Sequence, residues 1–410
     1  MRDALIIDGA RTPRGKGKPT GSLHEIHPQE LLAQVLNSLS ERNGLTLEDV
    51  DDVIIGNGSG DGDHGVCIGR LAVLAAGWPV EAPGLTLNRF CGSGQQAVAF
   101  GAMGIRAGFQ DLVVAGGVES MSRFERIAGT APDFTARNED LRARYPLVPQ
   151  GISADLIATL EGFGRDAVDA YAVTSQERAA TAQAEGRFGR SVIPVHGADG
   201  SVALDRDEHL RPGTTIDALS GLSPSFAEMG SITFDGFDRP FDEMCRQAYP
   251  DVDQIDHVHH GGNSSGVVDG AAAVVLASED YARGHGMTPR ARVVMHAVAG
   301  TEPVIMLTAP GPATEKVLAS AGMAIDDIDL FEINEAFAAV PMKTIRDLDL
   351  DPDKVNVNGG AIALGHPIGA TGAMLIQTAL DELERRDQTT ALVAMCTGGG
   401  MGTATIIERV

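Results

Sequence analysis

The sequence predicts an α/β fold built from two related halves, and three observations support this prediction. Short apolar runs alternate with amphipathic helical patterns along the chain. Apolar residues make up 43 % of the sequence but aromatic residues only 4 %, so the core is expected to consist of Ala, Val, Ile and Leu, as in strands covered by helices. Similar motifs recur in the same order near both ends. With 410 residues, the chain is long enough for two or three domains.

Ten short apolar runs, most of them bounded by turn-forming residues, are expected to be strands. They are residues 4–7, 53–55, 85–87, 112–115, 272–276, 292–295, 330–333, 354–357, 391–395 and 403–407. Five segments carry apolar residues at helical spacing and are expected to be helices, namely 28–42, 154–162, 166–186, 313–321 and 370–386. A further apolar helix is expected to follow the glycine-rich turn at 91–94.

The internal repeat is visible in three pairs of segments. Residues 49–57 parallel 327–335, and residues 112–117 resemble 392–399. The turns that begin at Cys91 and at His366 each reach a glycine after three residues and lead into a helix. We therefore expect two α/β halves that pack about a two-fold axis, which would bring these two turns to one pocket.

The middle of the chain differs from both ends, because it is rich in charges and poor in strand-like runs. Residues 120–255 contain 13 Arg and no Lys. We expect them to form a unit inserted into the first half. The expected organisation is therefore 1–119 with 256–287 as the N-terminal half, 120–255 as the insertion, and 288–410 as the C-terminal half.

Composition excludes several classes of function. The 32 Lys and Arg against 56 Asp and Glu give a net charge of −24, which disfavours nucleic acids and anionic membrane surfaces as partners. No run approaches the roughly 18 apolar residues of a transmembrane helix. The four cysteines lie far apart and form no CxxC pair, which argues against a zinc knuckle or a thioredoxin-like motif. A reduced, cytoplasmic enzyme is expected.

Cys91 lies where a short strand meets a glycine-rich turn that opens a helix, so the positive end of the helix dipole is expected to favour its thiolate. The alternative is a buried structural cysteine. The same stretch also matches a dinucleotide fingerprint through Gly92, Gly94 and Ala97. That pattern requires an acidic residue at the end of the next strand, whereas Asp111 begins that strand. A dinucleotide-dependent oxidoreductase is therefore the weaker interpretation.

His366 precedes Pro367, a typical first residue of a helix, so the histidine is expected at the helix cap. A helix N-terminus disfavours an imidazolium ion, which would leave the ring neutral and able to act as a base. The alternative is a histidine that serves only as a cap. A cysteine and a histidine at matched positions of two repeats favour the catalytic interpretation.

Two further candidates follow strands in the second half. Cys396 precedes a glycine run at 398–400, whose backbone N–H groups could bind an oxyanion beside a second thiol. Asn334 also ends a strand, and its amide could orient a water molecule or the imidazole. A turn or helix-cap asparagine is the alternative.

These motifs occur together and in order: CGSG at 91–94, NEAF at 334–337, GHP at 365–367 and C-x-GGG at 396–400. Arg-Thr-Pro at 11–13 and GNSSG at 262–266 accompany them. Over essentially its whole length the chain resembles the thiolase family. It is most similar to degradative 3-ketoacyl-CoA thiolases, particularly the β-subunits of trifunctional fatty-acid-oxidation complexes. The resemblance implies two five-stranded halves in a five-layer α-β-α-β-α sandwich, plus a loop domain that binds CoA.

The resemblance also implies roles for individual residues. Cys91 would be the acyl-accepting nucleophile, His366 would activate it, and Cys396 would move the second proton. Asn334 would hold a water molecule that, with His366, forms one oxyanion hole. The backbone N–H groups of Cys91 and Gly398 would form the other.

For the substrate, the resemblance implies that Ser265 contacts the pantetheine arm of CoA. The implied reaction is the cleavage of a 3-ketoacyl-CoA by CoA into acetyl-CoA and a shortened acyl-CoA during fatty acid β-oxidation. CoA and acyl-CoA are substrates, and neither a bound cofactor nor a metal is expected. A homodimer or homotetramer is implied, with a hydratase/dehydrogenase α-subunit as a further possible partner.

Three other interpretations stay open. A short-chain acetyl-CoA acetyltransferase could work in the condensing direction, although Gln150 stands where such relatives carry a methionine, which favours a degradative acyl pocket. A non-catalytic subunit is expected to have lost at least one motif residue. A ketoacyl synthase is expected to lack Cys396.

The cluster of His257, His259 and His260 could suggest a metal site. On a strand, the first two would share one face and His260 would point the other way, with no further convergent ligand evident. His260 could instead contact the CoA tunnel. Residues 61–64 resemble the start of a calcium loop but lack the rest of its pattern, so a polar turn is expected.

Overall fold

The computed structural model of the chain describes residues 2–124, 135–136 and 138–410. In this part of the chain the main sheet runs in the order β10-β11-β12-β9-β1-β8-β5-β3-β4, with β2 paired to β8. Its strands are β1 (Ala4–Arg11), β2 (Gly15–Lys16), β3 (Asp52–Gly56), β4 (Leu85–Leu87), β5 (Leu112–Ser120), β8 (Val268–Ser278), β9 (Ala291–Gly300), β10 (Leu330–Ile333), β11 (Thr390–Thr397) and β12 (Met401–Arg409). The sheet is mixed: the pairs at its two ends, β10 with β11 and β3 with β5 and β4, are parallel, and the pairs between them are antiparallel.

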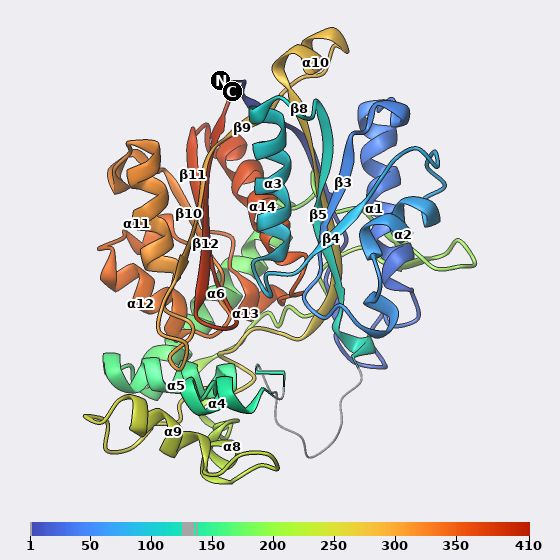
Figure 1. Ribbon diagram of the computed structural model, residues 1–410. Coiled ribbons are helices and arrows are strands. Elements are labelled where there is room, and N and C mark those ends of the chain that lie inside the picture. The colour runs from blue at the N-terminus through green and yellow to red at the C-terminus, as the bar shows by residue number, and fades with distance from the viewer. Residues whose placement is uncertain (1, 125–134, 137) are drawn as a thin grey trace.

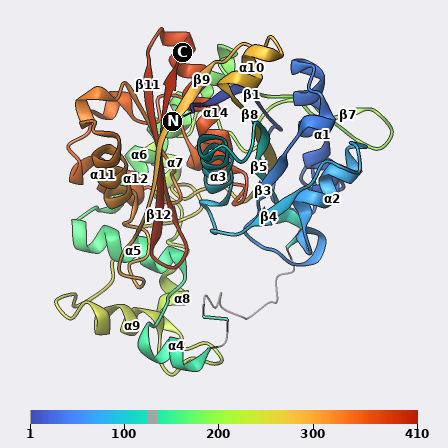
Figure 2. The ribbon, with the colours of Figure 1, turned by 45° about the horizontal axis from the view of Figure 1, so that its top comes forward.

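Helices cover and separate the two halves of this sheet, which gives the five layers that were expected (Figure 1). The helices α1 (Pro28–Asn43) and α2 (Ile68–Ala75) pack on the outer face of the N-terminal half, and α11 (Pro310–Ala321) packs on the outer face of the C-terminal half. Between the halves lie α3 (Ser93–Ala107) and α14 (Thr371–Arg386) (Figures 1 and 2). Strands β1 and β9 join the halves through only two residue pairs.

Nine of the ten expected strands are confirmed, and the prediction for 354–357 is wrong. Only Val355 forms an isolated bridge, to Phe331, after a short 3-10 turn at Pro352–Lys354. The next residue, Asn356, has a φ of 47°, and its side chain bonds both the backbone N–H and the carbonyl of Ile333. The asparagine side chain thus replaces the ladder bonds that a strand would make. The C-terminal half has four strands and this bridge, instead of five strands.

The two central helices approach each other through glycines at their starts. A Cβ atom on Gly94 would lie 2.6 Å from the carbonyl oxygen of Gly369, and one on Gly372 would lie 2.3 Å from the backbone nitrogen of Gln95. Side chains at these positions would push the helices apart. The structure therefore brings the Cys91 turn and the His366 turn together, as the repeat predicts.

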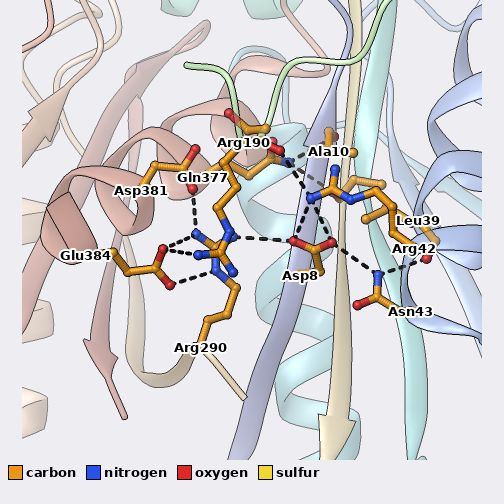
Figure 3. Close-up of polar contacts among 12 residues, drawn as sticks. Asp8, Ala10, Leu39, Arg42, Asn43, Arg190, Arg290, Gln377, Asp381 and Glu384 are labelled. Atoms are coloured by element: carbon orange, nitrogen blue, oxygen red, sulfur yellow. Dashed lines mark hydrogen bonds and ion pairs between the residues drawn. The ribbon is translucent and has the colours of Figure 1, made fainter. Parts of the chain in front are cut away.

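A buried polar network ties the N-terminal strand to both halves (Figure 3). Arg290, just before β9, pairs with Asp381 at 2.6 Å and with Glu384 at 2.8 Å on α14. Arg290 also lies 3.5 Å from Asp8 of β1, whose carboxylate pairs with Arg42 of α1 at 3.0 Å. Because buried charges are costly unless paired, this network fixes β1, α1 and α14 relative to each other.

Between β5 and β8 the chain adds further elements, part of which lies below the sheet in Figure 1. They are α4 (Glu139–Arg144), α5 (Gln150–Glu161), α6 (Arg165–Ala184), β6 (Val195–His196), β7 (Val202–Leu204), α7 (Ile216–Ser220), α8 (Ala227–Ser231) and α9 (Phe241–Ala248). Residues 191–207 return to the N-terminal half, where the Arg11 side chain pairs with Asp207 at 2.8 Å. The boundaries expected at 119/120, 255/256 and 287/288 stay predictions. No helix in the described part of the chain is long and apolar enough to cross a membrane.

The remaining helices complete the C-terminal half and its neighbourhood. They are α10 (Glu279–Gly284), α12 (Ala339–Asp347) and α13 (Ala361–Leu364). Helix α12 packs against α5, and α13 packs against α6. These contacts join the elements between β5 and β8 to the loops that follow β10 and precede α14.

Candidate active site

Cys91 lies in the turn between β4 and α3 and is 5 % exposed. The preceding residue, Phe90, has a φ of 48°, which is the left-handed region that non-glycine residues rarely adopt. The Ser93 hydroxyl stabilises this turn, because it accepts a hydrogen bond from the Arg89 N–H and donates one to the Phe90 carbonyl. Such strain at a turn that presents a cysteine is typical of functional sites.

The resting Cys91 side chain is a thiol, which differs from the thiolate expected from the helix dipole. Burial, with a smaller contribution from the charge of Glu119, raises the pKa of Cys91 to about 11. Hydrogen bonds from the Gln150 side chain and from the backbone N–H groups of Gly398 and Cys91 act in the opposite direction but do not outweigh burial. These contacts nevertheless place two backbone donors beside the sulfur.

His366 is 5 % exposed and does not cap α14, which begins only at Thr371. The Thr371 hydroxyl donates its proton to the Pro367 carbonyl, so towards His366 its oxygen can only accept. The His366 Nδ1 atom lies 2.6 Å from this oxygen and therefore carries the proton of the hydrogen bond. The Nε2 atom of His366 is therefore the basic nitrogen. Burial, assisted by the charge of Arg14, lowers the pKa of His366 to about 3. The ring is neutral as expected, but because of burial rather than a helix cap.

Asn334 follows β10 and faces His366, with 3.5 Å between Asn334 Nδ2 and His366 Nε2. Its backbone N–H donates to the Ala394 carbonyl of β11, which fixes the residue at the strand end. Among the described residues, the buried Oδ1 atom of Asn334 has no hydrogen-bond partner. A buried oxygen of this kind fits a bound water molecule.

Cys396 lies near the end of β11, directly before the tight turn into β12. Gly399 and Gly400 have φ values of 76° and 78°, which allow the turn to close. Burial, together with the neighbouring Cys91, raises the pKa of the Cys396 thiol. The glycine turn thus lies beside Cys91, with a second protonated thiol next to it.

Ser265 lies in the segment that connects these loops. It is partly exposed, and its backbone N–H donates to the Ala336 carbonyl at 2.9 Å. The next residue, Gly266, accepts a hydrogen bond from the His366 N–H at 2.9 Å. Ser265 is therefore close in space to both the Asn334 loop and the His366 turn.

Two contributors were missed by the sequence analysis. Thr371 fixes the tautomer of His366, and its only sequence signal is a hydroxyl five residues after the histidine. Glu119, buried at the end of β5, accepts hydrogen bonds from Gly369 N at 2.8 Å and Gly58 N at 2.7 Å. It ties the His366 turn to the N-terminal half. Nothing in the sequence around Glu119 distinguishes it from a surface carboxylate.

The glycines that suggested a dinucleotide site have another use in the structure. Gly94 provides the close approach to Gly369, and a Cβ on Gly92 would lie 2.9 Å from the Thr397 and Thr403 methyl groups. These positions serve contacts between the two halves. The structure gives no support to the oxidoreductase interpretation.

The three histidines of the cluster do not share one carboxylate partner. His257 and His259 both contact Asp155, at 2.7 Å in each case, and His260 contacts Asp169 at 2.9 Å. His257 and His259 share one partner and His260 has another, which agrees with the opposite orientation expected for His260, although the segment is not a strand. No group of three or more His, Cys, Asp or Glu residues in the described ranges is arranged to hold a metal ion.

Comparisons with known proteins agree with this arrangement. Residues 4–236 match the thiolase N-terminal domain and residues 287–409 match the thiolase C-terminal domain. The chain is 41 % identical to a 3-oxoadipyl-CoA/3-oxo-5,6-dehydrosuberyl-CoA thiolase of Escherichia coli (strain K12), with 100 % of both chains covered.

Two solved structures also superpose over 100 % of this chain and 99 % of theirs. One is an acetyl-CoA acetyltransferase of Bacillus anthracis, with a TM-score of 0.83 and 34 % identity. The other is human mitochondrial 3-ketoacyl-CoA thiolase, with a TM-score of 0.84 and 33 % identity. The chain therefore belongs to the thiolase family and is an acyltransferase that acts on acyl-CoA thioesters.

Proposed function

We propose that this thiolase cleaves 3-ketoacyl-CoA with CoA, through an acyl group on Cys91. The observation that carries the proposal is the arrangement around the two thiols. Backbone N–H groups of Cys91 and Gly398 lie beside the Cys91 sulfur, while Asn334 and the basic Nε2 of His366 face each other. Two separate oxyanions can be stabilised in such a site, and the cleavage of a 3-ketoacyl thioester produces two.

In the first half-reaction, His366 Nε2 takes the thiol proton as the Cys91 sulfur attacks the 3-keto carbon. Because the resting pair is neutral, this proton moves only as the attack proceeds. The Cys91 and Gly398 N–H groups stabilise the resulting oxyanion. The bond between the α and β carbons then breaks, and the electron pair forms the enolate of acetyl-CoA.

The enolate oxygen is stabilised by protonated His366 and by a water molecule on Asn334, while the Cys396 thiol protonates the enolate carbon. Acetyl-CoA leaves, and a second CoA thiol gives its proton to the Cys396 thiolate. The CoA sulfur attacks the acyl carbon, and the Cys91 thiolate that leaves recovers its proton from His366. Both thiols and the neutral imidazole are thereby restored. CoA and acyl-CoA act as substrates, with Ser265 contacting the pantetheine arm.

The degradative direction is favoured by Gln150, whose side chain hydrogen-bonds to the Cys91 thiol. It places a polar amide at the acyl site. The Escherichia coli relative is named for 3-oxoadipyl-CoA, a polar substrate, so a dicarboxylic 3-ketoacyl-CoA is a candidate beside the fatty acyl substrates of β-oxidation. The condensing acetyl-CoA acetyltransferase stays the alternative, and it is supported by the Bacillus anthracis structure. A trifunctional-complex subclass with an α-subunit remains a prediction.

The test compares CoA-dependent loss of acetoacetyl-CoA, 3-oxoadipyl-CoA and a long-chain 3-ketoacyl-CoA. We expect turnover by the wild type and a loss of at least about 10³-fold in Cys91→Ala, whose site lacks the nucleophile. The ratio between the three substrates assigns the acyl class. Equal activity in wild type and Cys91→Ala would contradict the proposed mechanism.

A further inference from the structure

The Asp155 carboxylate is the centre of a buried cluster that the proposed chemistry does not use. Asp155 lies on α5 and its side chain is fully buried. Its two oxygens accept hydrogen bonds from His257 Nδ1 and His259 Nδ1, both at 2.7 Å, and from the backbone N–H groups of Val258 and His259. A single carboxylate thus holds three consecutive residues.

The His259 side chain connects Asp155 to the loop that carries Asn334. Its Nε2 atom accepts the Ala339 backbone N–H at 3.4 Å, at the first residue of α12. Since a backbone N–H can only donate, Nδ1 carries the proton and donates it to Asp155. The same ring packs edge-on against Phe337, with ring centroids 5.6 Å apart. His259 therefore contacts the 334–339 loop in two independent ways.

The chain that follows His259 contacts both catalytic loops. The Asn263 carbonyl accepts a hydrogen bond from the Ala338 N–H at 3.0 Å, and the Ser265 N–H donates to the Ala336 carbonyl at 2.9 Å. Gly266 then accepts from the His366 N–H at 2.9 Å. Residues 259–266 are thus held at one end by Asp155 and reach the two catalytic loops at the other.

We propose that Asp155 and His259 are positioning residues, which set the Asn334 amide toward His366 by holding residues 334–339 against α5. This inference rests on the proposed function, in which Asn334 and His366 stabilise the enolate. His257 shares Asp155, but its other nitrogen contacts Asp242 of α9 at 3.1 Å, away from the Asn334 loop. It therefore lies outside this connection, although it has the same chemistry and the same central partner.

Comparing two reactions of the enzyme distinguishes a misplaced Asn334 from a general loss of structure. Exchange of labelled CoA into acetyl-CoA needs only transfer of the acetyl group to Cys91 and back, with no carbon–carbon bond broken. Thiolysis of acetoacetyl-CoA also needs the enolate to be stabilised at Asn334. A misplaced Asn334 therefore lowers the ratio of thiolysis to exchange, whereas partial unfolding lowers both rates together.

Two substitutions of His259 test its contact with Asp155 and its contact with Ala339 separately. His259→Asn places an amide nitrogen near the position of Nδ1, which keeps the bond to Asp155 and loses the acceptor for Ala339. His259→Gln places an oxygen near the position of Nε2, which keeps that acceptor. We expect His259→Asn to lower thiolysis kcat about tenfold, with KM and exchange within about twofold of wild type, and His259→Gln to recover most of the ratio.

His257→Gln is the matched control, and it should leave kcat and the ratio unchanged even where the melting temperature falls. Asp155→Asn should lower the ratio as His259→Asn does. The positioning role would be overturned if His259→Asn lost both reactions in parallel or left the ratio of thiolysis to exchange unchanged. It would also be overturned if His257→Gln lowered that ratio as much as His259→Asn. Absence of both reactions in the wild type would overturn the proposed function and this inference with it.

Discussion

At the scale of single residues, the protonation states of Cys91 and His366 define how the site starts its reaction. Both groups are buried, and burial disfavours the charged form of each. The pKa of the thiol is raised to about 11 and that of the imidazole is lowered to about 3. The resting pair is therefore uncharged, unlike the thiolate–imidazolium pair of many cysteine enzymes.

The first prediction concerns alkylation of Cys91 by iodoacetamide without substrate. Because only the thiolate reacts, the rate should rise about tenfold per pH unit between pH 7 and 10, with no plateau. The modified peptide is followed by mass spectrometry. Cys91→Ala serves to subtract the reaction of the partly exposed Cys67. A rate that is high and constant from pH 6 to 8 would show that an ion pair forms before substrate binds.

The candidate residues of the site could be found from the sequence, but their electrostatics could not. Cys91, His366, Asn334 and Cys396 each follow or precede a recognisable strand or glycine turn. Their helix-end positions suggested dipole effects, whereas depth of burial determines the shifts. Burial depends on contacts between segments about 300 residues apart, such as the pairing of the Cys91 turn with the glycine turn after β11, and no local pattern encodes it.

At the scale of elements, the crossing of α3 and α14 depends on glycines that a single methyl group would disturb. We expect Gly94→Ala to destabilise the protein by more than about 2 kcal/mol, since its Cβ would lie 2.6 Å from a backbone oxygen that cannot move alone. Gly284→Ala is the control, because nothing lies within 4 Å of its Cβ, and it should be neutral or stabilising by up to about 1 kcal/mol. The urea unfolding midpoints of the two variants measure these effects, and equal midpoints for Gly94→Ala and Gly284→Ala would refute the packing argument.

A second prediction at this scale concerns the contact between α5 and α9. Burial alone would lower the pKa of His257, but hydrogen bonds and charges of Asp155 and Asp242 outweigh it and raise that pKa to about 9. The resulting stabilisation is fully present below pH 6.5, the ordinary value, and is lost as the pH rises through 9. We expect up to about 3 kcal/mol to be lost over this window. Melting temperatures of wild type and His257→Gln check this, because the variant should show a flatter decline.

The boundaries of an element could be predicted where its segment is strongly periodic. The prediction failed where a side chain makes the hydrogen bonds that strand backbone would make. The helices at 28–42 and 370–386 agree with α1 and α14 to within a residue. The strand expected at 354–357 fails because Asn356 bonds the backbone of Ile333 with its amide. The two valines at 355 and 357 gave no sign of such a bond, since it depends on a partner 23 residues away.

At the scale of the whole molecule, the repeat predicted the two halves and the meeting of their helix starts. It did not predict that residues 191–207 return to the N-terminal half through Arg11 and Asp207. Charged pairs between distant segments leave no periodic signal. The active site therefore depends on three parts of the chain at once: the two halves supply the reactive groups, and α5 with residues 257–266 connects to their loops.

The exposed edge of the N-terminal half leads to the last prediction, which is self-association. Strand β4 pairs only with β3 within the described residues, and it ends the sheet four residues before Cys91. Edge strands of this kind tend to pair with another chain unless they are covered. On α3, Phe100 and Met103 are 44 % and 46 % exposed. Light scattering of the purified protein should therefore give a dimer or tetramer.

The variant that tests the exposed face of α3 is Phe100→Glu with Met103→Glu, which introduces two charges there and should yield monomers if that face is also buried on association. Leu160→Glu is the control, because Leu160 is 43 % exposed near the end of α5, which lies away from β4 (Figure 1). It should leave the mass unchanged. A monomeric wild type, or dissociation by the control alone, would contradict association through the N-terminal half. Because β4 leads directly into the Cys91 turn, we also expect the monomeric variant to lose thiolysis activity while its secondary structure, measured by circular dichroism, is retained.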